Sequence, residues 1–222
     1  AAEALFDLAM LGIHLSRIGE EFILWSSNEF NWVQISDAYT TGSSIMPQKK
    51  NADIAELARG KSGRFIGNLT SLLVVLKGLP FAYNRDLQED KEPVFDSIDQ
   101  LLVLLPALTG MVQTAKFNPD KISANVTSGF SLATEIADYL AKKQVPFAIA
   151  HEAAGMCVKI CESNSIELDQ LTDAQFAQIH PALTSDVRKV LNVKSAVASR
   201  SSSLGTASAS VGKAIRSEER RV

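Results

Sequence analysis

Cysteine is scarce in this sequence, and the two cysteines that occur do not form a disulfide framework. Cys157 and Cys161 lie four positions apart in a helical pattern, which places both thiols on one helix face. A metal site that combines them with His151 is conceivable but disfavoured, because the sequence has no zinc-type ligand spacing. Packed or surface thiols in a reducing cytosol are the favoured interpretation, so we expect a cytoplasmic protein.

The sequence also lacks an excess of one charge and a long apolar run. Its 22 basic and 25 acidic residues leave a net charge of −3, so neither nucleic acid nor an anionic membrane is predicted as a partner. The most apolar run, Leu101–Val112, is too short to span a bilayer and contains Pro106. No signal peptide, internal repeat or nucleotide-binding loop is visible, and no cofactor or metal is predicted.

Apolar residues at three- and four-residue spacing are what the sequence does contain in quantity. They predict three long helices, at Ala1–Trp25, Asn51–Lys77 and Glu92–Thr114, with a kink or a break at Pro106 in the third. Three helices of this length joined at alternate ends indicate an antiparallel bundle. The first residues are already in helical register without an initiator Met, so we expect a carboxy-terminal fragment of a longer protein.

The pattern changes after residue 115. Asn118-Pro119 is a turn signal, and shorter helices follow to the end of the chain. The sequence therefore predicts an all-α protein, with a helical-bundle domain at 1–115 and a small helical carboxy-terminal domain at 116–222. The shorter helices are expected near Ser131–Lys143, Phe147–Ser163, Asp173–Gln178 and Ala207–Glu219.

The second long helix carries small and basic residues on its surface. Three glycines at three- and four-residue spacing each cost about 1 kcal/mol against Ala, which predicts close approach by another helix. The cations are predicted to be exposed or to pair with neighbouring helices. These residues are Gly60, Gly63 and Gly67, and Arg59, Lys61 and Arg64.

The stretch from Thr40 to Arg64, which reads TTGSSIMPQKKNADIAELARGKSGR, is the most informative in the sequence. A Gly-Ser-Ser loop passes through Met46 and Pro47 to two lysines, and Asn51 is predicted to cap the helix that follows. Free backbone N–H groups, a helix start and a nearby cation suit a carboxylate or a phosphate. A flexible loop with solvated lysines is the alternative interpretation, and composition alone does not decide between them.

The exact residue string favours an anion-binding loop over a flexible surface loop. GSSIMPQKKN resembles the signature of the fumarase/aspartase superfamily, and Gln-Lys-Lys-Asn after Met-Pro is similar to argininosuccinate lyases and their delta-crystallin relatives. ELARGKSGR, LATEIADYL, VPFAIAHEAAG and LGTASASVGKAI also resemble segments of that family, so the similarity reaches the end of the chain. One departure is Ala52, where relatives usually have proline; the junction between loop and helix is therefore expected to be looser.

The resemblance implies a long-helix bundle and a lyase that cleaves argininosuccinate to arginine and fumarate, a reaction of arginine biosynthesis and the urea cycle. A base removes a proton beside a carboxylate, and positive groups must stabilise the charge that spreads into that carboxylate. By resemblance, Ser43 is the base, Lys49 supplies positive potential, and Ser44 and Asn51 bind substrate. Glu56 matches a glutamate that pairs with a histidine of another subunit.

A second loop, Gly78–Asp90, is followed by Lys91 and carries a cluster of donors. Composition alone favours a polar surface turn. The string YNRDLQEDKE resembles the second substrate-contacting loop of argininosuccinate lyases, which implies that Tyr83, Gln88 and Lys91 bind substrate. Arg85 stands where many relatives have lysine, so the charge is kept.

The resemblance further implies a homotetramer whose active sites are shared between subunits, and a fragment that is inactive alone. None of His14, His151 and His180 lies in a matching segment, so structural roles are predicted for all three. Two alternatives remain: another fumarate-releasing lyase of the superfamily, and a crystallin-like structural protein of the same fold with little activity.

Overall fold

The computed structural model describes residues 1–46, 48–126 and 128–220. It is mostly helical, and its internal contacts divide it into two compact units, residues 1–122 and 123–222. The domain boundary predicted from the sequence, at 115/116, falls where the third long helix ends. Each unit is described by itself below.

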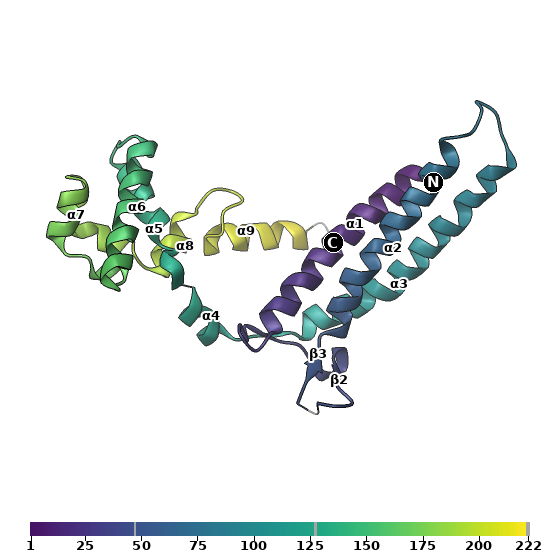
Figure 1. Ribbon diagram of the computed structural model, residues 1–222, viewed down its shortest axis with the longest axis horizontal. Coiled ribbons are helices and arrows are strands. Elements are labelled where there is room, and N and C mark those ends of the chain that lie inside the picture. Colours follow the sequence, from purple (N-terminus) through teal and green to yellow (C-terminus); the bar gives the residue numbers. More distant parts are fainter. Residues whose placement is uncertain (47, 127, 221–222) are drawn as a thin grey trace. The chain divides into compact units, whose positions relative to one another are not determined.

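Three long helices run side by side and antiparallel in the first unit (Figure 1). They are α1 (Ala2–Ser26), α2 (Asp53–Leu76) and α3 (Lys91–Thr114). The three-four apolar spacing therefore predicted all three helices to within two residues at each end. α3 continues through Pro106 without a break, and by length and composition alone the segment Arg85–Thr114 could cross a membrane. One such helix is weak evidence for a membrane span, because the core helix of a bundle passes the same test.

α1 and α2 approach closely where a glycine faces an aromatic ring. A Cβ on Gly12 would lie 2.6 Å from Cδ2 of Phe65, whose side chain is 1% exposed. The glycines that the sequence singled out for close approach behave differently: around Gly60, Gly63 and Gly67 nothing in the described part of the chain lies within 4 Å of an added Cβ. That prediction is wrong within this chain, because those three glycines face away from α1 and α3.

Polar side chains of α2 connect it to both neighbouring helices, as the sequence predicted for its cations. Arg59 pairs with Glu20 of α1, and Lys61 donates to Gln100 of α3. Arg64 binds Asp96 of α3 through two hydrogen bonds, and this guanidinium is the main reason that the pKa of Asp96 is lowered. Asn68 donates to both Asp96 (2.8 Å) and the buried Ser97 (2.9 Å).

Short strands and 3-10 turns connect the long helices. β1 (Val33–Gln34) pairs antiparallel with β4 (Lys116–Phe117), and β2 (Thr41–Gly42) pairs antiparallel with β3 (Lys50–Asn51). The connector between α1 and the hairpin thus forms the strand β1, followed by the turn η1 (Asp37–Tyr39). η2 (Arg85–Asp90) precedes α3 at the other end of the bundle.

The second unit is built from shorter helices around its own core. α4 (Pro119–Asn125) crosses the boundary between the units, and α5 (Ala133–Lys142) and α6 (Phe147–Asn164) pack together. The four predicted helices are all present, whereas α4 and α8 were not expected. The remaining elements are η3 (Ser128–Phe130), η4 (Leu168–Gln170), α7 (Asp173–Ile179), η5 (Ser185–Lys189), α8 (Val193–Ser199) and α9 (Ser208–Glu219).

Both cysteine thiols are fully buried in the core of the second unit, and burial raises the pKa of each, that of Cys157 to about 12. The thiolate is the reactive form, so neither side chain reacts readily at neutral pH. We expect a thiol-specific reagent to label neither cysteine of the native protein, and to label both after unfolding in denaturant. Rapid labelling of the native protein would contradict this placement.

Acid sensitivity of the second unit is expected to involve Asp186. Hydrogen bonds from Thr184 and from Tyr139 (2.6 Å) lower the pKa of this carboxyl to about 2. A pKa below its unfolded value stabilises the folded state above the ordinary pKa of about 3.9, and this stabilisation is lost as the pH falls toward 2. Asp186→Asn should therefore flatten the fall of the urea midpoint between about pH 4 and pH 2. An unchanged fall of the urea midpoint would show that other groups control the acid sensitivity.

Candidate active site

The signature loop lies at the tip of a two-stranded hairpin, at the end of the bundle where α1 ends and α2 begins (Figure 1). β2 and β3 align Thr41 with Asn51 and Gly42 with Lys50, so the loop from Ser43 to Lys49 closes over a paired stem. The N–H of Ser43 donates to the carbonyl of Lys49 at 3.2 Å and extends the ladder by one bond. Pro47 lies outside the described residues.

The Ser43 hydroxyl is surrounded by backbone donors. Its Oγ accepts hydrogen bonds from the N–H groups of Ile45 (3.2 Å) and Met46 (3.1 Å). Hydrogen bonds to an oxygen favour its negatively charged form, so this arrangement eases loss of the hydroxyl proton. Ser43 is half-buried, whereas Ser44 is exposed and Ile45 is 86% exposed at the tip of the loop.

Asn51 does not cap α2, contrary to the sequence-based prediction. It lies in β3, where its backbone pairs with Thr41, and α2 begins at Asp53 with Ala52 as its N-cap and no side-chain capping bond. Strand pairing fixes the backbone of Asn51 in an extended conformation, which leaves its side chain free for another contact. The carboxamide oxygen accepts from Lys49 Nζ, so the amide NH₂ remains available to a ligand.

Two adjacent lysines of the hairpin have different partners. Lys49 contacts Asn51, whereas Lys50 forms an ion pair with Asp37 of η1. Glu56 lies in the first turn of α2 and is exposed. Asp53 is nearby in sequence, and its Oδ2 is buried without a hydrogen-bond partner among the described residues.

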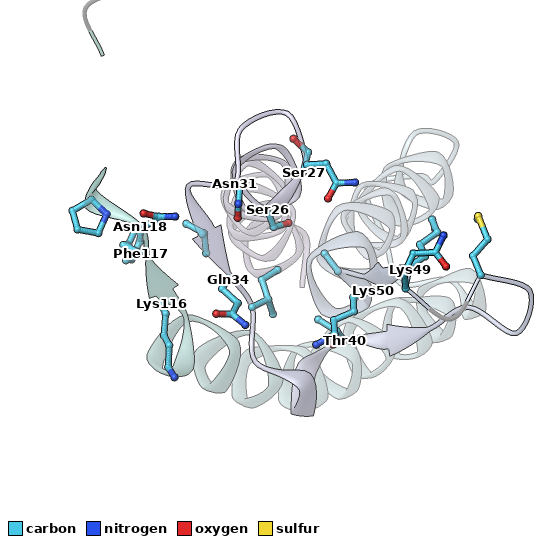
Figure 2. Close-up of a pocket in the computed structure, with 17 residues that line it drawn as sticks. Ser26, Ser27, Asn31, Gln34, Thr40, Lys49, Lys50, Lys116, Phe117 and Asn118 are labelled. Atoms are coloured by element: carbon cyan, nitrogen blue, oxygen red, sulfur yellow. The ribbon is translucent and has the colours of Figure 1, made fainter. Parts of the chain in front are cut away.

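An open groove of about 850 Å³ lies beside the hairpin (Figure 2). Lys49 and Lys50 form one wall, and Lys116, from the β1–β4 pair, lies on the other. The described residues of the lining include no carboxylate, so the groove suits an anion. Sequence reasoning missed Lys116, Gln34 and Asn118, since only the pairing of strands more than eighty residues apart brings them here.

The second predicted cluster lies at the opposite end of the bundle. Tyr83 Oη accepts from Gln88 Nε2 at 2.7 Å, and Lys91 contacts Asp90 at 3.2 Å. All three predicted binding residues are exposed. The 24 residues of α2 separate the two clusters by a helix about 36 Å long, so one chain does not bring them around one small ligand.

The three histidines belong to elements other than those that carry the two clusters. His14 is in α1, and His151 is in α6 with its ring 6.2 Å from that of Phe147. His180 Nδ1 accepts from the N–H of Ala182 at 3.1 Å and holds a turn after α7. Among the described residues, no group of three or more His, Cys, Asp or Glu side chains is arranged to hold a metal ion.

Comparison with known proteins gives related sequences and folds. Residues 130–198 match the family described as Argininosuccinate lyase C-terminal, and residues 1–67 match the family described as Lyase. The argininosuccinate lyase of Streptomyces griseus is 63% identical over 95% of this chain, and that of Rhodococcus jostii is 58% identical over 93%. In each case the chain spans about 44% of the relative's length.

Solved structures agree on the fold. A structure of EDDS lyase in complex with formate superposes with a TM-score of 0.85 at 26% identity, over 97% of this chain and 45% of that one. An EDDS lyase variant with bound fumarate gives a TM-score of 0.87 at 25% identity, over 99% of this chain and 46% of that one. With the signature hairpin and the bundle described above, these similarities show that the chain belongs to the argininosuccinate lyase family of the fumarase/aspartase superfamily.

Proposed function

We propose that this chain provides the signature-loop part of an active site that cleaves argininosuccinate to arginine and fumarate, in arginine biosynthesis. The observation that carries the proposal is the Ser43 hydroxyl, held by two backbone N–H groups beside Lys49 and Asn51. Similarity to argininosuccinate lyases over most of the chain supports the choice of substrate. The protein is proposed to act in the cytoplasm, without a metal or a cofactor.

The proposed chemistry is a base-catalysed elimination. Ser43, as the alkoxide, removes a proton from the carbon next to a substrate carboxylate, and the electron pair moves into that carboxylate as a doubly charged aci-form. Lys49 and the free NH₂ of Asn51 stabilise the growing charge, with Ser44 as a further contact. When the carbon–nitrogen bond breaks, the double bond of fumarate forms, and the leaving nitrogen must receive a proton.

Glu56 is proposed to orient the group that handles this last proton. Glu56 is exposed in the first turn of α2, so its carboxylate is accessible to a side chain from another subunit. By family resemblance, that side chain is a histidine of another subunit. None of the three histidines in this chain lies in a segment that resembles the one that supplies this histidine.

A shared active site is the part of the proposal that the geometry supports most strongly. The loop that carries Ser43 and the loop that carries Tyr83, Gln88 and Lys91 lie at opposite ends of α2, about 36 Å apart. A small substrate reaches both only if they come from different chains. The long helices also expose large apolar side chains such as Phe6, Phe95 and Leu102, as expected of helices that pack in a homotetramer.

Two alternatives are distinguished by the substrate. Another fumarate-releasing lyase would use a different amine-bearing substrate, and a crystallin-like protein would assemble and show little turnover. The strings around Lys49 and Tyr83 favour argininosuccinate over the first. Against the second, the groups proposed for catalysis are present and are not buried by other described residues.

Subunit mixing tests the proposal. Ser43→Ala and Lys91→Met, each made in the chain joined to its upstream sequence, should be inactive alone with argininosuccinate. Unfolded together and refolded, they should recover a fraction of wild-type fumarate release, because some sites then receive one intact loop from each parent. No recovery from mixed tetramers would contradict a site shared between these two loops.

A further inference from the structure

Tyr39 of η1 lies directly on Gly110 of α3. A Cβ added to Gly110 would overlap the Tyr39 hydroxyl and lie 2.6 Å from Cζ, closer than real Cβ contacts come. The half-buried ring of Tyr39 packs against the core of the first unit, which includes Leu108 and Met111 of α3. Any side chain larger than hydrogen at position 110 would displace it.

The contact is made four residues before the proposed base. Thr40 alone separates Tyr39 from β2, and Ser43 follows β2 directly. η1 is held in shape by the N–H of Tyr39, which donates to the Ser36 carbonyl at 2.9 Å. A displacement of Tyr39 is therefore passed to the hairpin stem through a short and ordered segment.

The other side of the hairpin is attached to α2. β3 leads into α2 through Ala52 alone, and the ion pair between Lys50 and Asp37 connects β3 back to η1. α2 and α3 are themselves joined through Asn68, which donates to Asp96 and Ser97. The hairpin is thus attached to the helical bundle at the start of α2 and at Gly110 of α3.

We propose that Tyr39 is a positioning residue for the signature loop, and that the seat formed by its ring on Gly110 fixes the stem from which Ser43 is presented. The inference rests on the proposed function of that loop. A loop at the tip of a fixed stem changes conformation around substrate without losing the placement of its base. Without the seat, the stem stays attached at the start of α2, and its other side is next held at the buried Ile35, four residues before Tyr39.

The experiment uses four variants of the chain joined to its upstream sequence. Tyr39→Phe keeps the ring, Tyr39→Leu removes it without a clash, and Gly110→Ala pushes it away. The double variant Gly110→Ala with Tyr39→Leu tests whether the two residues act as one unit. Gly155→Ala in α6 is the matched control, because nothing lies within 4 Å of its added Cβ.

For Gly110→Ala and Tyr39→Leu we expect kcat with argininosuccinate to fall about tenfold or more, while KM changes less than about threefold. Tyr39→Phe and Gly155→Ala should retain kcat. The double variant should be no slower than the slower single variant. Purely structural packing predicts instead lower stability with unchanged kcat, and independent effects predict that the two losses multiply; either result would overturn the proposal.

Tryptic cleavage after Lys49 and Lys50 gives a second measurement that does not depend on turnover. Loss of the seat should accelerate cleavage at these two sites in Gly110→Ala and Tyr39→Leu, and leave it unchanged in Tyr39→Phe. An unchanged cleavage rate in both disrupted variants would contradict the seat. If the wild type releases no fumarate, the proposed function fails, and cleavage still decides whether Tyr39 holds the stem.

Discussion

Replacement of Ser43 by alanine should lower kcat for argininosuccinate by about a thousandfold or more, because general-base catalysis contributes up to about 10⁴. The hydroxyl accepts two backbone N–H bonds at 3.2 and 3.1 Å, and no other described hydroxyl of the loop has such donors. Initial rates of fumarate release, with substrate saturating, measure the effect.

The same substitution should leave folding almost unchanged. Ser43 is half-buried in a loop, and the two N–H groups that it accepts from can be solvated when the hydroxyl is removed. Ser62→Ala is the matched control, since this serine is also half-buried, lies on α2, and among the described residues its hydroxyl bonds only the Arg59 carbonyl. Turnover retained in Ser43→Ala, or unfolding of that variant, would assign the residue a structural role instead.

Phe65→Ala should cost about 3–5 kcal/mol of unfolding free energy, the largest stability effect expected in the bundle. The ring is 1% exposed and fits against Gly12, where α1 and α2 meet. Truncation leaves a cavity that neither helix can fill, since Gly12 contributes no side chain. Urea unfolding of the first unit, followed by circular dichroism, measures the loss.

Phe81→Ala is the matched control for this prediction. Phe81 lies in the loop between α2 and α3 and is fully exposed, so the same truncation removes no packing within the chain. The unfolding free energy of Phe65→Ala should therefore be lower than that of Phe81→Ala by most of the expected loss of about 3–5 kcal/mol. Equal losses would mean that the contact between α1 and α2 contributes little.

The long helices were predictable because their signal is local. Apolar residues at three- and four-residue spacing identify α1, α2 and α3 from the sequence of each helix alone. The identity of the neighbouring helix is not needed, because any packed neighbour buries the apolar face. Contacts between helices were less predictable. Close approach was assigned to Gly60, Gly63 and Gly67, whereas Gly12 and Gly110 face an aromatic ring, because which face meets a partner depends on the other helix.

The residues proposed for the candidate site come from sequence strings and stay predictions, whereas the geometry around them could be compared with the structure. The signature string identified Ser43, Lys49 and Asn51, and the structure shows their contacts within the hairpin. The prediction that Asn51 caps α2 was wrong. It used only the residues next to Asn51, whereas the conformation of Asn51 is set by its pairing with Thr41 across the hairpin. Lys116 carries no local motif and enters the groove only through β4.

The most direct test of the account is the product analysis of argininosuccinate with the chain joined to its upstream sequence. The account predicts fumarate and arginine in equal amounts, with adenylosuccinate, malate and aspartate left unchanged under the same conditions. Fumarate from one of those other substrates, or no product from an assembled tetramer, would contradict it.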